Sequence, residues 1–227
     1  MVVNIHEKPV GDEFDPGGAV LADLGKWRVQ IRQEFKDLFQ PPTGVPPPRK
    51  DDFCILTDST AKILHRQPYR MTPAGREEFE KQIKKLLENS WVTDSHSQYV
   101  APVIFVKKTD STALRMCVDY RRLHKITAKD RYPLPYIDDL LDRLHAGRVF
   151  TKLDLASGYH QVRIHPDDCH KTALIAPDGF CEYKVIPFRL AYVPAAFMRM
   201  MYRILHSHRR HAIVYLDDVM IFSRTLY

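Results

Sequence analysis

Apolar residues recur at helical spacing along several stretches of the chain, and polar or proline-rich segments separate these stretches. The clearest pattern follows Thr72-Pro73, a capping residue and a proline suited to the first helical turn, and continues to Asn89. Gly147 follows another such stretch and could take the left-handed conformation that ends many helices. The spacing predicts helices over residues 21–39, 72–89, 134–144 and 194–205.

Short apolar runs bounded by turn residues predict β-strands between these helices. The polar residues 109–112 and the sequence Pro177-Asp178-Gly179 are typical of hairpin turns. Together with the helices, the strands indicate an α/β (α+β) fold class. The expected strands cover residues 103–106, 114–118, 149–155, 171–175 and 181–186, and two more lie within 212–222.

Composition narrows the classes of protein that fit. The chain has 227 residues, of which 44% are hydrophobic and 27% charged, and this balance excludes a mainly disordered chain. The net charge of +6 falls entirely in residues 51–227, which permits a polyanionic partner such as nucleic acid. No stretch approaches about 18 apolar residues, and the first ten residues are partly charged, so we expect no membrane partner and an intracellular protein, cytoplasmic or nuclear and not secreted.

Two adjacent aspartates, Asp217 and Asp218, interrupt the apolar run 212–222, and Asp154 ends the predicted strand 149–155. A buried, unpaired carboxylate costs several kcal/mol, so each needs compensation. A basic partner, exposure at a tight turn or a bound cation would supply it, and no lysine or arginine lies between His211 and Ser223. For the aspartate pair alone, a solvated turn is the simpler interpretation.

If the strand ends converge, the three carboxylates could bind two divalent cations about 3.5 to 4 Å apart, an arrangement suited to phosphoryl transfer. Mg²⁺ is the natural candidate, with Mn²⁺ as a substitute. Because neighbouring strand residues point to opposite faces, Asp217 and Asp218 can both reach the cations only if the chain turns there. We expect Asp217 to be a ligand and Asp218 to lie further out.

Tyr215-Leu216-Asp217-Asp218 matches the Tyr-x-Asp-Asp signature of reverse transcriptases, and residues 150–164 (FTKLDLASGYHQVRI) are similar to the first catalytic motif of gypsy-type LTR retrotransposons. Residues 99–108, 114–121 and 130–135 resemble further blocks in the same order. Several blocks in family order are far more specific than a single short motif. Over about residues 35–227, the chain resembles the reverse transcriptase domain of a gypsy-type LTR retrotransposon polyprotein.

The resemblance implies a right-hand polymerase fold and an RNA-directed DNA polymerase, a nucleotidyltransferase that adds dNTPs to a primer 3′-hydroxyl by two-metal-ion catalysis. Its partners would be dNTPs and an RNA or DNA template with primer, and the oligomeric state is unknown. The implied domains are an N-terminal helix and linker (1–48), fingers (49–148) and palm (149–227). The implied catalytic and metal-binding groups are Asp154, Asp217, Asp218 and the carbonyl of Leu155.

The resemblance also implies a nucleotide-binding set. Lys108 and Arg115 would grip the triphosphate, a role suited to a point cation and a planar fork. Tyr159 would exclude a 2′-hydroxyl, and Phe188 would line the nucleotide pocket. From spacing alone, the charged pair could equally be solvated surface residues, and Tyr159 an ordinary core or surface tyrosine.

The chain departs from the family pattern at two positions, where Arg189 replaces a glycine and Tyr192 an asparagine. Glycine at such a site usually permits a positive φ or a close backbone approach, so we expect these changes to be damaging. The sequence ends soon after Asp218, so we expect fingers and a partial palm, with the thumb absent. A catalytically silent retroelement remnant that folds and binds nucleic acid is the alternative.

A metal site at His206, His208 and His211 is a further alternative. Arg209 and Arg210 lie between these histidines and would repel a cation. A basic segment facing phosphates explains the same residues more simply.

Overall fold

The chain forms two compact units, each assembled from segments that are far apart in the sequence. The computed structural model describes residues 3–6, 17–50, 52–58, 60–61, 67–107, 114–130, 132–145 and 147–224. The first unit comprises residues 1–42, 135–158 and 201–227, and the second unit comprises residues 43–134 and 159–200. The implied fingers and palm are consecutive stretches drawn on a different criterion, and their boundaries stay a prediction.

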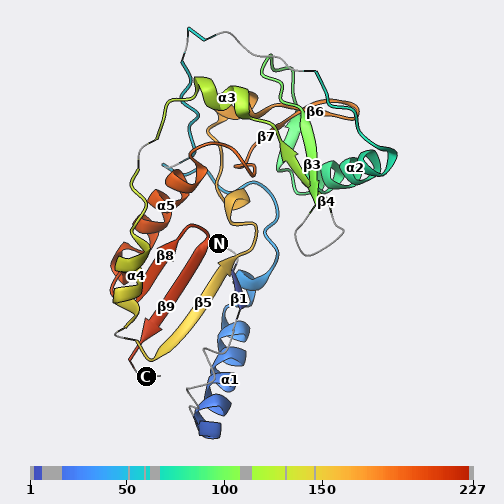
Figure 1. Cartoon of the computed structure of the whole chain (residues 1–227). Helices are drawn as coiled ribbons and strands as arrows, with labels where there is room; N and C mark the ends of the chain where they lie inside the picture. Colours follow the sequence, from blue (N-terminus) through green and yellow to red (C-terminus); the bar gives the residue numbers. More distant parts are fainter. Residues whose placement is uncertain are drawn as a thin grey trace. The chain divides into compact units, whose positions relative to one another are not determined.

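An antiparallel sheet organises the first unit. Its strand order is β1-β5-β9-β8, and the strands lie side by side in Figure 1. The predicted strand over residues 149–155 and the two strands within 212–222 are confirmed, whereas β1 was not predicted. The strands are β1 (Val3–His6), β5 (Val149–Leu155), β8 (Ala212–Tyr215) and β9 (Asp218–Ser223).

Helix α4 (Ile137–Leu144) supplies the core of this unit. Its Leu140 packs with Ile213 of β8 and Phe222 of β9. The helix begins three residues later than predicted: Pro135 disfavours helical backbone at Leu134, and Tyr136 is extended, with a ψ of 133°.

Gly147, which follows α4, does not take the predicted left-handed conformation. A Cβ atom there would lie 2.9 Å from the Phe150 ring and 3.1 Å from Phe222. The absence of a side chain at residue 147 therefore allows these two aromatic residues to pack closely.

A long helix and a short 3₁₀ segment complete the amino-terminal part of the first unit. They are α1 (Gly17–Glu34) and η1 (Lys36–Phe39), which together cover most of the predicted helix over residues 21–39. Trp27 of α1 and Phe35, which lies between the two segments, are exposed. Among the described helices of the chain, none is long and apolar enough to span a membrane.

The second unit contains α2, which begins and ends where its sequence signals predict. Thr72 caps it, since the Thr72 Oγ1 accepts a hydrogen bond from the Gly75 N–H at 3.1 Å. Phe79, Ile83 and Leu86 form its buried face. The elements of this unit are α2 (Pro73–Glu88), β2 (Val92–Asp94), β3 (Val103–Lys107), β4 (Leu114–Val118), α3 (Arg121–Ile126), η3 (Pro166–Thr172), β6 (Leu174–Ala176) and β7 (Gly179–Tyr183). The short segment η2 (Gly158–Gln161) begins at the boundary between the units and lies mostly in the second.

The strands of the second unit form a β3-β4 hairpin (Figure 1) and a β2-β7-β6 sheet, and all pairs are antiparallel. The turn predicted at residues 109–112 lies outside the described residues. The predicted pairing of strands is confirmed for both hairpins, although the strands β6 and β7 are shorter than predicted. Residues 171 and 172 belong to η3 instead, because the Thr172 hydroxyl donates to the Cys169 carbonyl at 2.7 Å and accepts from the Tyr183 N–H at 2.9 Å. Helix α5 (Val193–Ile204) contains the boundary between the units, and η4 (His206–His208) follows it.

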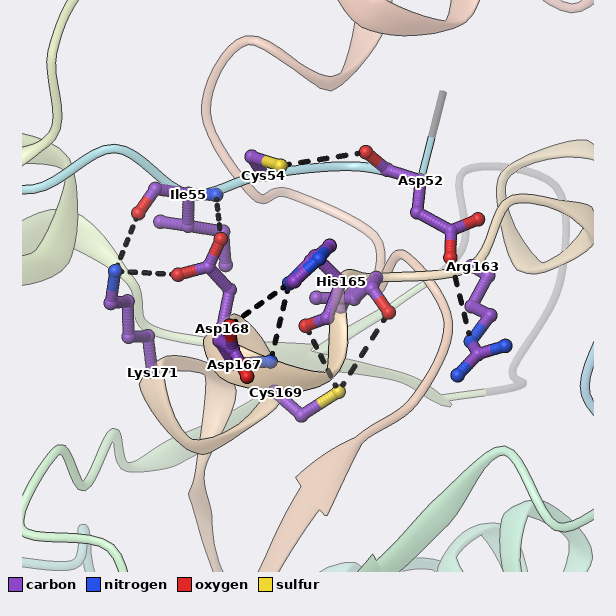
Figure 2. Close-up of polar contacts among 10 residues, drawn as sticks. Asp52, Cys54, Ile55, Arg163, His165, Asp167, Asp168, Cys169 and Lys171 are labelled. Atoms are coloured by element: carbon purple, nitrogen blue, oxygen red, sulfur yellow. Dashed lines mark hydrogen bonds and ion pairs between the residues drawn. The ribbon is translucent and has the colours of Figure 1, made fainter. Parts of the chain in front are cut away.

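An extended segment, residues 52–58, is fastened to η3 by the polar contacts in Figure 2. The Ile55 N–H donates to the Asp168 carboxylate at 2.8 Å, and the Lys171 ammonium donates to the Ile55 carbonyl at 2.7 Å. Lys171 also donates to Asp168 at 2.6 Å, so both members of this largely buried ion pair hydrogen-bond to the backbone of Ile55 as well as to each other. The contacts hold the start of the second unit against its core.

Candidate functional site

A two-residue turn joins β8 to β9 and places Asp217 at its tip. Tyr215 and Asp218 pair across the hairpin, and Leu216 between them has a φ of 56°. A left-handed conformation costs a leucine about 1 to 2 kcal/mol. Strain of this kind gathers at functional sites, and the turn that both aspartates require is present.

Asp154 and Asp218 lie directly opposite each other on β5 and β9. Directly paired residues of antiparallel strands project to the same face of the sheet, so both carboxylates share one face. Asp154 and Asp217 are half-buried, whereas Asp218 is exposed, and Leu155 is buried at the end of β5. Carboxylates from two distant stretches of sequence therefore meet.

Lys152 compensates the charge of Asp218. Its Nζ atom lies 3.0 Å from both Asp218 carboxylate oxygens. The residues between His211 and Ser223 do not reveal this partner, because Lys152 comes from β5, far away in the sequence. The available signal was the alternation of β5, which puts Lys152 on the same face as Asp154.

The donors in this region suit a hard cation, because carboxylate and carbonyl oxygens are the ligands that Mg²⁺ and Mn²⁺ prefer. Among the described residues, however, no three His, Cys, Asp or Glu side chains form a group that could hold a metal ion. The chemistry of the donors therefore fits, while the observed side chains pair Asp218 with Lys152. The same finding gives no support to a metal site at His206, His208 and His211.

Tyr159, implied to exclude a 2′-hydroxyl, and Phe188, implied to line the nucleotide pocket, contact each other in the second unit. Their ring centroids are 5.8 Å apart and their planes nearly perpendicular, at 83°. The Tyr159 ring also packs edge-on against the fully buried Phe197, at 5.2 Å. Phe188 is 46% exposed, so it presents a supported aromatic surface to an incoming group.

His160, a residue that carries no functional signal in the sequence, also packs against Phe188. Its ring lies 5.2 Å from that of Phe188 and 4.4 Å from that of Trp91. The residue is buried, its Nδ1 has no hydrogen-bond partner, and burial lowers its pKa to about 4. A neutral imidazole therefore acts here as an aromatic packing group.

We predict that stability falls between pH 7 and pH 4 because of His160. The unfolded state, with an ordinary histidine pKa of 6.5, binds the proton before the folded state does, so acid lowers the free energy of unfolding by up to about 3 kcal/mol. Urea unfolding at several pH values measures this loss. His160→Phe should reduce the dependence of the free energy of unfolding on pH. The exposed control His206→Phe should leave this dependence unchanged. If wild type and His160→Phe lose stability equally between pH 7 and pH 4, His160 is not the cause.

Of the two residues implied to bind the triphosphate, the structure describes Arg115 but not Lys108. Arg115 is exposed on β4, where it pairs with Val106 of β3. Lys108 lies outside the described residues, although Lys107 at the end of β3 is described and exposed. The roles of Lys108 and Arg115 stay a prediction.

Arg189 and Tyr192 both adopt left-handed backbone conformations, with φ angles of 68° and 61°. Glycine and asparagine, the residues of the family pattern, tolerate this conformation far better than arginine and tyrosine. The turn is also tied to α3, because the Ala191 N–H donates to His124 Nε2 at 2.9 Å. Both departures from the pattern therefore introduce backbone strain.

Restoring the family residues should relieve this strain. We expect Arg189→Gly and Tyr192→Asn each to raise the free energy of unfolding by about 1 kcal/mol, measured by urea denaturation. Arg76→Gly makes the same chemical change at an exposed position of the right-handed helix α2 and should destabilise by about 1 kcal/mol. Destabilisation by Arg189→Gly comparable to that control would refute the strain argument.

The chain is similar in sequence to a known protein family and to several polyproteins. The family model described as reverse transcriptase (RNA-dependent DNA polymerase) matches residues 106–227, more than half of the chain. The chain is 37% identical over 177 residues to the retrovirus-related Pol polyprotein from transposon 297 of Drosophila melanogaster, covering 76% of this chain and 17% of that protein. It is 34% identical over 200 residues to the transposon Tf2-3 polyprotein of Schizosaccharomyces pombe, and the match covers 86% of this chain and 15% of that protein.

A third relative is the enzymatic polyprotein of cauliflower mosaic virus, 34% identical over 172 residues, covering 74% of this chain and 25% of that one. The chain thus spans a quarter or less of these curated relatives. Among solved structures, the prototype foamy virus protease-reverse transcriptase is similar, with a TM-score of 0.76 and 20% sequence identity. The match covers 90% of this chain and 27% of that one. At this identity the likeness shows a shared fold, and it confirms the predicted mixed α/β polymerase fold.

Proposed function

We propose, from the premise that this chain belongs to the reverse transcriptase (RNA-dependent DNA polymerase) family, that it adds deoxynucleotides to the 3′-hydroxyl of a primer. The family assignment confirms the resemblance noted in the sequence; the gypsy-type subdivision stays a prediction. The single observation that carries the proposal is the in-register pairing of Asp154 with Asp218, one residue from the strained turn that presents Asp217.

Members of this family use divalent metal ions. We assign Asp154, Asp217 and the Leu155 carbonyl as the groups that would hold two Mg²⁺ ions, or Mn²⁺ in their place, with Asp218 further out. When bound, such ions supply the positive charge that stabilises the attacking and leaving oxygens of phosphoryl transfer. The chain itself fixes the oxygen donors, because β5 and β9 set the separation of the carboxylates and the turn orients Asp217.

The remaining implied residues would bind the nucleotide. Arg115 offers a planar fork and Lys108 a point charge, which together suit a triphosphate. Tyr159, braced against Phe188 and Phe197, would occupy the space that a 2′-hydroxyl needs, so deoxynucleotides would be preferred. An RNA or DNA template with its primer is the proposed macromolecular partner. The foamy viral relative has been solved with an RNA/DNA hybrid, and the net charge of +6 here is compatible with such a ligand.

Primer extension tests the proposal. The purified chain is incubated with a labelled DNA primer on an RNA template, the four dNTPs and Mg²⁺. We expect products that lengthen with time and disappear when EDTA is added. If an established reverse transcriptase extends the same substrate and this chain does not, at any concentration, the chain alone is not a polymerase.

A second candidate function is a catalytically silent domain that folds and binds nucleic acid. The observation that favours it is the pair of left-handed, non-glycine residues, Arg189 and Tyr192, which follow Phe188 in the sequence. Under this alternative, the wild-type chain binds template and primer without extending the primer, and the Arg189→Gly, Tyr192→Asn double variant gains extension. If the wild-type chain extends the primer as well as the double variant does, this alternative is excluded.

A further inference from the structure

We propose that Lys152 is a positioning residue that occupies Asp218 and thereby weakens the hold of the neighbouring carboxylates on a divalent cation. The inference rests on the proposed function, since it takes Asp154 and Asp217 as the cation ligands. Its direction is specific: removing Lys152 should make cation binding tighter.

The register of the sheet places Lys152 where it can act in this way. Lys152 pairs with Met220, and Asp154 pairs with Asp218, so Lys152 and Asp218 are diagonal neighbours on one face. The ammonium group is 3.0 Å from each carboxylate oxygen of Asp218. Both oxygens are therefore engaged by one cationic side chain, two residues before Asp154.

Electrostatics gives the direction of the effect. In the metal-free chain, the Lys152 charge offsets that of Asp218 and lowers the negative potential around Asp154 and Asp217. A divalent cation entering this region meets both the repulsion of Lys152 and a carboxylate that is already paired. Without Lys152, Asp218 adds its full charge to the site, and a cation offsets that charge.

The arrangement has a functional consequence. A cation held by fewer protein carboxylates keeps coordination positions for oxygens of the substrate, which phosphoryl transfer requires. Lys152 would keep Asp218 out of the ligand set and so favour substrate oxygens over a third carboxylate. This agrees with the expectation, drawn from the sequence, that Asp218 lies outside the cation ligands.

An ordinary surface ion pair is the competing explanation. The Lys152 and Asp218 side chains are 44% and 50% exposed, and exposed pairs contribute little to stability. A pair of that kind would leave cation affinity unchanged when it is removed. Cation affinity therefore separates the two explanations, and it does not depend on polymerase activity.

The experiment is a titration of the full chain with MnCl₂, in which electron paramagnetic resonance reports free Mn²⁺ and MgCl₂ is then added as competitor. Lys152→Met, which keeps the length of the side chain, should lower the dissociation constant by roughly fivefold. Lys152→Arg, which keeps the charge, and Lys36→Met, an exposed control in η1, should stay within about twofold of wild type. Circular dichroism verifies folding, and Lys152→Gln replaces Lys152→Met if the latter does not fold.

The measured Mn²⁺ affinities support or overturn the proposal. An affinity that is unchanged or weaker in the folded Lys152 variant overturns it. If Lys152 acts through Asp218, the effect of Lys152→Met should shrink by at least about half in an Asp218→Asn background, and an undiminished effect overturns that route. Equal affinities with intact primer extension refute only this inference, whereas Mn²⁺ binding that survives Asp217→Asn refutes the proposed ligand assignment with it.

Discussion

Replacing Asp217 with asparagine should reduce primer extension by about 10³-fold or more, equivalent to about 4 kcal/mol of transition-state stabilisation. Asparagine keeps the size of the side chain and removes its charge, so the strained turn at Leu216 can form as before. The loss would therefore report the carboxylate itself. Single-turnover extension with saturating template and dNTP measures it.

Matched variants sharpen the test. Asp154→Asn should cause a loss of similar size, and Asp218→Asn a smaller one, because Asp218 is already paired with Lys152. Asp142→Asn removes an exposed carboxylate on α4 of the same unit and should leave extension unchanged. An Asp217→Asn variant as active as Asp142→Asn would eliminate Asp217 as a catalytic residue.

Replacing Tyr159 with valine should lower the preference for dNTPs over rNTPs by roughly 10²-fold in kcat/KM. The ring is braced edge-on by Phe188 and Phe197, at 5.8 and 5.2 Å, so it cannot easily give way to a 2′-hydroxyl. A smaller side chain opens that space. The measurement compares incorporation of one dNTP and its rNTP on the same primed template.

Tyr159→Phe is the control for this prediction, because it keeps the ring and removes only the hydroxyl group. It should discriminate as wild type does, and both variants should incorporate dNTPs. Loss of discrimination in Tyr159→Phe would assign the selectivity to the hydroxyl instead of the ring. Unaltered discrimination in Tyr159→Val would remove Tyr159 from the nucleotide-binding residues.

Local signals explain which elements could be predicted from the sequence. The cap at Thr72, the apolar stripe of α2 and the run of β5 are encoded by residues that are close together in the chain, and the structure has each of them. The β8-β9 turn also has a local signal, because two adjacent aspartates inside an apolar run favour a bend in the chain. The positive φ at Arg189 follows likewise from the family's glycine at that position.

Contacts between distant segments account for what sequence reasoning missed. The Lys152–Asp218 ion pair depends on the register of two strands that are far apart in the sequence. The environment of His160 depends on Trp91 and Phe188, which come from other parts of the second unit. The pairing of β1 with β5 is non-local as well, and Val3–His6 is too short to signal a strand.

The most direct test of the cation site is cleavage of the chain by hydroxyl radicals generated at bound Fe²⁺, used as a substitute for Mg²⁺. The account predicts cuts in two segments, around residues 154–155 and 216–218, that excess Mg²⁺ suppresses and Asp217→Asn abolishes. Cleavage confined to one segment, or located elsewhere in the chain, would contradict the claim that both segments hold the cations.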